Sequence, residues 1–144
     1  NIKKEYYDVI AEGMERAVTG GTCRRANLLP EFTVCGKTGT AENPHGKDHS
    51  IFMGFSPKEN AKVAIFIIVE NGGFGATYAV PIGRLMLLKY LKGEVPLAEK
   101  GLETQLASTS ILPGMINWNR SREILKVEEA QPVEEEAVQT ETQE

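Results

Sequence analysis

The segment 62–70 limits the possible folds of this chain more than any other part of the sequence. Its apolar run, Val63 to Val69, is the longest in the chain but far shorter than the roughly 20 residues of a membrane-spanning helix. One face of the corresponding strand would carry Val63, Ile65, Ile67 and Val69, and the other Ala64, Phe66 and Ile68. We therefore predict a strand that is covered on both faces and lies in the centre of its sheet.

Two further strands are predicted upstream, at 32–40 and 49–56. The loop 57–61 that joins the second strand to segment 62–70 is short enough for a hairpin. We therefore expect these two strands to be antiparallel neighbours.

Helical periodicity lies on both sides of the strands. Apolar residues recur at three- and four-residue spacings over 2–18, and Gly20-Gly21 ends that helix. A strongly apolar helix is predicted over about 77–91, and it should pack across the sheet. The fold class expected is α+β, a three-stranded antiparallel sheet flanked by helices.

Charge divides the chain of 144 residues unevenly. Residues 126–144 hold seven glutamates and one lysine, a charge of −6, so residues 1–125 carry +2 of the total of −4. A nearly neutral body argues against nucleic acid as a partner. We divide the chain into a folded portion at 1–93, a C-terminal extension at 94–125 and a low-complexity acidic tail at 126–144, which we expect to be disordered.

Cysteine and histidine give weaker signals. Cys23 and Cys35 permit one disulfide, although two buried thiols explain them as well, so their pairing stays open. His45 and His49 lie four residues apart near Asp48, but a metal site needs three or four ligands on a scaffold. We interpret this stretch as a solvated loop and predict no metal and no other cofactor.

The motif most suggestive of chemistry is Gly36-Lys37-Thr38-Gly39-Thr40. A phosphate-binding P-loop would need glycine at position 31, where the chain has Glu31. A P-loop also leads into a helix, whereas Pro44 and Gly46 follow here without helical periodicity. The sequence therefore argues against a P-loop.

The same residues fit a strand with a binding edge. Lys37 would face the side opposite to Thr38 and Thr40, and Gly39 would let a ligand backbone approach closely. Two hydroxyls and an ammonium suit a carboxylate or a developing oxyanion, and an outer strand can pair with an extended peptide. An ordinary strand with a surface lysine and two threonines is the alternative.

Several elements together resemble the penicillin-binding transpeptidases, whose third motif is K-T-G. In order, they are Gly36 to Glu42, Asp48-His49 opening a strand, Gly54 to Pro57 closing it, and Val63-Ala64 through Val69 to Gly73. The resemblance covers about residues 1–92. The Asp-His and Glu-Asn-Gly-Gly elements are most similar to the penicillin-binding protein 2 group, the class B enzymes of cell elongation.

The resemblance implies roles for Lys37, Thr38, Gly39 and Thr40 as the catalytic motif. Lys37 would bond to the serine of the family's second motif. The Thr38 and Thr40 hydroxyls would hold the carboxylate of a D-Ala-D-Ala stem peptide or a β-lactam. The Thr40 N–H would form half of the oxyanion hole.

The nucleophile of the family is missing from this sequence. None of its serines is followed by lysine three positions later, so no S-x-x-K is present, and no S-x-N either. We expect the chain to be a piece of a longer protein, inactive alone, whose nucleophile lies upstream. The alternative is a self-contained, non-catalytic peptide-binding or regulatory module that uses the edge strand 36–40.

The resemblance also implies a setting for the longer protein. It would be a single-pass inner-membrane protein with a periplasmic catalytic domain, working with a glycosyltransferase of the elongation machinery. The piece itself would be soluble. It would self-associate, because its sheet would lack the neighbouring strands of the family fold.

Overall fold

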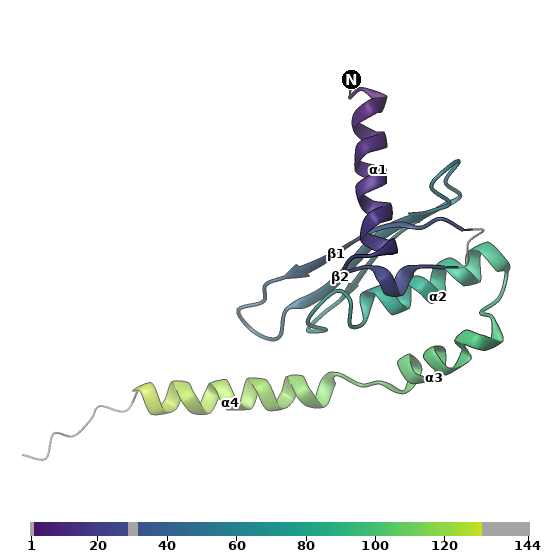
Figure 1. Cartoon of the computed structure of the whole chain (residues 1–144). Helices are drawn as coiled ribbons and strands as arrows, with labels where there is room; N and C mark the ends of the chain where they lie inside the picture. Colours follow the sequence, from purple (N-terminus) through teal and green to yellow (C-terminus); the bar gives the residue numbers. More distant parts are fainter. Residues whose placement is uncertain (1, 29–31, 131–144) are drawn as a thin grey trace, which may run out of the picture.

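The computed structural model describes residues 2–28 and 32–130. Its helices and strands are α1 (Lys4–Thr19), η1 (Arg24–Ala26), β1 (Cys35–Ala41), β2 (His49–Ser56), β3 (Val63–Val69), α2 (Ala79–Lys92), η2 (Leu97–Glu99), α3 (Lys100–Ser108) and α4 (Leu112–Ala130). Helix α1 rises from the region of β1, α2 runs along the sheet, and α3 and α4 continue away from α2 (Figure 1). The predicted α+β class, a three-stranded antiparallel sheet flanked by helices, is confirmed.

The strands form one sheet in the order β1-β2-β3, and both pairs are antiparallel. The predicted hairpin between β2 and β3 is therefore confirmed, but the prediction that β3 is central is wrong. Phe66 and Ile68 on its second face are 58% and 52% exposed. Apolar residues on both faces of a strand therefore do not show whether the strand lies in the centre or at the edge of its sheet.

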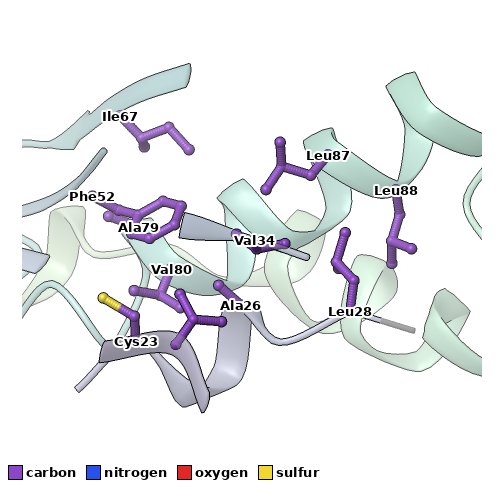
Figure 2. Packing of buried hydrophobic residues seen from close by; sticks show 11 residues of the cluster. Cys23, Ala26, Leu28, Val34, Phe52, Ile67, Ala79, Val80, Leu87 and Leu88 are labelled. Carbon is purple, nitrogen blue, oxygen red and sulfur yellow. The ribbon is translucent and has the colours of Figure 1, made fainter. Parts of the chain in front are cut away.

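The core lies between one face of the sheet and α2. Phe52 of β2 and Ile67 of β3 share this face and pack in one cluster with Ala79, Val80 and Leu87 of α2. Figure 2 shows the Phe52 ring beside Ala79. The cluster also contains Val18, Cys23, Ala26, Leu28, Val34 and Leu88.

Two glycines make room for the Phe52 ring. A Cβ atom at Gly83 of α2 would lie 2.5 Å from Phe52 Cδ1, and one at Gly36 of β1 would lie 2.7 Å from Phe52 Cε2. Helix and sheet can therefore approach each other closely only because both positions lack a side chain.

A buried serine fixes the start of α2 relative to β2. The Ser50 hydroxyl donates to the Phe74 carbonyl at 3.0 Å and accepts the Ala79 N–H at 3.1 Å. The first N–H groups of a helix lack partners within the helix, so this contact satisfies one of them. Ser50 thus acts as a cap supplied from the sheet.

The predicted helix limits are close to the observed ones. The first helix was predicted from residue 2 and begins at Lys4, and the N–H of Gly20 bonds to the Arg16 carbonyl at 3.0 Å. Helix α2 ends at Lys92 and is followed by Gly93, whose φ of 81° is in the left-handed region.

Helix α4 continues past residue 126, where we placed the start of the tail, and runs to Ala130. The rest of the predicted disordered tail, 131–144, lies outside the described residues.

The C-terminal extension is joined to α2 by an ion pair. The Arg84 guanidinium donates to both carboxylate oxygens of Glu99, at 3.0 and 2.5 Å, and also to the Asn27 carbonyl. Hydrogen bonding to Arg84 lowers the pKa of the Glu99 carboxyl. In the described part of the chain, no helix combines the length and apolar character needed to cross a membrane.

Candidate active site

The predicted site residues lie on β1, an outer strand of the described sheet. Thr38 is directly opposite the buried Phe52, and Thr40 is opposite Ser50, so both threonines are on the face that α2 covers. Lys37 is opposite the exposed Met53 and is therefore on the open face. The motif thus presents its ammonium and its hydroxyls on different sides of one strand.

Lys37 is exposed, and its ammonium lies along its own strand. The Nζ atom donates to the Thr38 carbonyl at 2.8 Å. Because Lys37 is exposed, its ammonium can exchange this contact for another acceptor at low energetic cost.

Thr38 has a hydrogen-bond partner that no sequence motif indicates. Its hydroxyl oxygen lies 2.8 Å from the hydroxyl oxygen of Thr22, which follows the end of α1. The preceding Gly20-Gly21 indicated only where the helix ends. Sixteen residues separate the two threonines, and no periodic pattern connects them.

The turn between β3 and α2 packs closely against the backbone of β1 beside Gly39, and the approach of a ligand backbone at Gly39 stays a prediction. A Cβ atom at Gly75 would lie 2.7 Å from the Gly39 carbonyl oxygen, 2.4 Å from the Ile51 oxygen and 3.1 Å from Thr38 Cβ. The backbone of this turn therefore rests directly on β1 and β2 beside Thr38. Only glycine fits at position 75 without displacing it.

Beyond Thr40, the β1–β2 loop is tied to the turn after β3. The Asn43 amide donates to Asn71 Oδ1 at 3.0 Å, and the Gly73 N–H donates to the Asp48 carbonyl at 2.8 Å. Our interpretation of this stretch as a solvated loop is wrong for His49, which is half-buried and accepts the Asn71 N–H at Nδ1, at 3.0 Å. Within the described ranges, no three His, Cys, Asp or Glu side chains are grouped to hold a metal ion.

The two cysteines are unpaired and buried. Burial raises the pKa of the Cys23 thiol, which lies beside Thr22 and Thr38, and burial also raises the pKa of Cys35. Both sulfurs are therefore protonated at neutral pH and poorly reactive. The Cys23 side chain, next to Thr22 and Thr38, is consequently uncharged.

The three-stranded antiparallel sheet and its helices agree with the family that the sequence matches. Residues 1–87 match the family model described as penicillin binding protein transpeptidase domain, and the chain belongs to this family.

Individual relatives agree with this result. Peptidoglycan D,D-transpeptidase MrdA of Haemophilus influenzae is 31% identical over 111 residues, which are 65% of this chain and 17% of the relative. The solved structure of Pseudomonas aeruginosa PBP2 in complex with WCK 5153 aligns with a TM-score of 0.54 at 30% identity, over 64% of this chain and 21% of that one.

Penicillin-binding protein A from M. tuberculosis, solved as an imipenem acyl-enzyme complex, also aligns with a TM-score of 0.54. It is 31% identical, and the alignment covers 62% of this chain and 20% of that one. The predicted resemblance, including its penicillin-binding protein 2 character, is confirmed. The chain spans about a sixth of the length of the Haemophilus relative.

Proposed function

We propose that this chain supplies the K-T-G-T strand of a peptidoglycan D,D-transpeptidase, which cross-links stem peptides by serine acyl transfer and is acylated by β-lactams. The observation that carries the proposal is Lys37-Thr38-Gly39-Thr40 on an outer strand in a chain of the transpeptidase family. The D,D-transpeptidase name of the Haemophilus relative and the imipenem acyl-enzyme of the mycobacterial protein support it.

The motif residues would have separate roles. Lys37, exposed on the open face, would bond to a serine of the second motif and keep the cleft electropositive. The hydroxyls of Thr38 and Thr40, on the opposite face, would hold the terminal carboxylate of the donor peptide or of the drug. The N–H of Thr40 would donate to the oxyanion, and Gly39 would leave room for the ligand backbone.

The nucleophilic serine would come from a part of the protein outside these 144 residues. Ser50 and Ser56 are fully buried, and each hydroxyl donates to a backbone carbonyl, that of Phe74 and that of Thr33 respectively. Neither is followed by lysine three positions later. A buried hydroxyl engaged in this way cannot attack a β-lactam.

The roles are tested in the complete protein by the acylation rate with a fluorescent penicillin. We expect Lys37→Ala, and the Thr38→Val/Thr40→Val double substitution, each to slow acylation by about 10² to 10³-fold with little change in melting temperature. Lys62→Ala is the matched control, because Lys62 is an exposed lysine just before β3. Unchanged rates in both site variants would contradict the assignment.

The chain alone tests whether the nucleophile lies elsewhere. We expect no fluorescent label on the denatured 144-residue chain after long incubation with the penicillin, because no activated serine is available. Label that survives denaturation and maps to Ser50 or Ser56 would mean that the chain holds its own nucleophile. The peptide-binding module would be favoured if the chain bound a D-Ala-D-Ala peptide while the complete protein was not acylated by the penicillin.

We also propose that the chain self-associates with a second copy through its open sheet face. Met53, Phe66 and Ile68 are exposed there, and β1 and β3 have no strand neighbour on their outer sides among the described residues. Exposed strand edges beside apolar side chains favour pairing between chains. Light scattering should show a dimer or larger species that Phe66→Lys/Ile68→Lys dissociates, and a monomer at high concentration would contradict this.

For the complete protein we propose a single-pass inner-membrane anchor, a periplasmic catalytic domain and a partner glycosyltransferase of cell elongation. These proposals rest on the family resemblance. We expect the complete protein to be recovered in the inner-membrane fraction. After cross-linking, we expect it to be recovered together with a polymerising glycosyltransferase. Recovery in the cytosolic fraction would contradict the location.

A further inference from the structure

The structure gives the motif residue Thr38 a partner from a distant part of the chain. Thr22 follows α1, and its hydroxyl oxygen lies 2.8 Å from that of Thr38. We propose that Thr22 is a positioning residue, which donates its hydroxyl proton to Thr38 and so directs the Thr38 proton toward a substrate carboxylate. This inference rests on the proposed carboxylate-binding function of Thr38.

Either hydroxyl can donate across this contact, and a carboxylate bound at Thr38 would select one direction. Each threonine hydroxyl has one proton to donate and two lone pairs that accept, and a carboxylate only accepts. If Thr38 donated to Thr22, its proton would be unavailable to a bound carboxylate. If Thr22 donates instead, Thr38 keeps its proton for the ligand, and the chain of two hydroxyls strengthens that contact.

Neighbouring segments restrict the pair on the side away from solvent, while the Thr22 side chain itself is exposed. The Gly75 backbone closes one side, where a Cβ atom would come 3.1 Å from Thr38 Cβ. The buried Cys23 thiol lies next to both hydroxyls and, being neutral, does not compete as an anion. Arg25 donates to the Ala76 carbonyl at 3.2 Å, which ties the segment after α1 to the turn before α2. A donor fixed in advance costs less to order when the ligand binds.

The test is a double-mutant cycle in the complete protein, read out as acylation by a penicillin and by its carboxylate methyl ester. We expect Thr22→Val to slow acylation by the free acid about 10-fold, near the upper size of one hydrogen bond between neutral hydroxyls, and to affect the ester much less. Thr22→Ser, which keeps the hydroxyl, should restore the rate with the free acid. In a Thr38→Val background, Thr22→Val should cause no further loss, because it acts only through Thr38.

Thr19→Val is the matched control, since Thr19 is an exposed threonine near the end of α1 whose hydroxyl donates to the Arg16 carbonyl at 3.4 Å. It should leave both rates unchanged. Equal losses with acid and ester, or additive losses with Thr38→Val, would overturn the inference even though Thr38 binds the carboxylate. Acylation that does not depend on Thr38 at all would overturn the proposed role of Thr38 and this inference together.

Discussion

The two faces of the sheet are built from similar residues but have opposite surroundings. On one, Phe52 and Ile67 are buried under α2, whereas on the other Phe66 and Ile68 are more than half exposed. The first face holds the fold together and carries the hydroxyls of the motif. The second carries Lys37 and, apart from the start of β1 where α1 covers Cys35, is available to other chains or other parts of the protein. The hydrophobicity of a strand residue therefore does not show whether its side chain packs in the core or lies on an exposed surface.

The largest difference should be seen with one aromatic residue from each face. Phe52→Ala should destabilise the chain by about 3–5 kcal/mol, because it removes a fully buried ring and leaves a cavity under α2. Phe66→Ala should change stability much less, by about 0.5–1 kcal/mol, because this residue is already 58% exposed. Urea unfolding of both variants at low protein concentration measures the difference. Equal losses would show that the second face is also covered.

A pair of glycine substitutions tests the close packing of α2 on the first face. Gly83→Ala should destabilise by about 1–3 kcal/mol, because its Cβ would come 2.5 Å from the Phe52 ring. Gly13→Ala in α1 has no neighbour within 4 Å and should stabilise by about 0.5–1 kcal/mol through helix propensity. Thermal unfolding of both variants gives the comparison, and a neutral Gly83→Ala would mean that α2 can move away from the sheet.

The smallest expected effect concerns the Arg84–Glu99 pair, which joins the covering helix to the extension. Because the pKa of Glu99 is lowered in the folded chain, its contribution is complete above its ordinary pKa of about 4.5 and is lost as the pH falls through the lower folded value. Glu99→Gln should therefore cost about 1 kcal/mol at pH 7, with the difference from wild type vanishing in acid. Urea unfolding at several pH values measures it. A constant difference across this pH range would exclude a charge effect.

The sequence predicted the strands, the hairpin and α2 well, because each depends on local periodicity and on nearby glycine or proline. It placed β3 wrongly in the centre, since Phe66 and Ile68 look the same whether they are covered or exposed. The motif at 36–40 was found because its residues are adjacent in the sequence. Thr22 was not found, since its contact with Thr38 depends on how α1 packs against β1.

The approach of Gly75 to the strand also restricts how this site can evolve. Any side chain at position 75 would collide with the carbonyl oxygens of Gly39 and Ile51, so a variant there would displace the turn whatever it did for ligand choice. Heritable changes in ligand preference would have to accumulate on the other sides of Thr38, at Thr22 or along β1 toward Thr40. Resistance to a carboxylate-bearing drug would accordingly be sought at those positions and not in the turn.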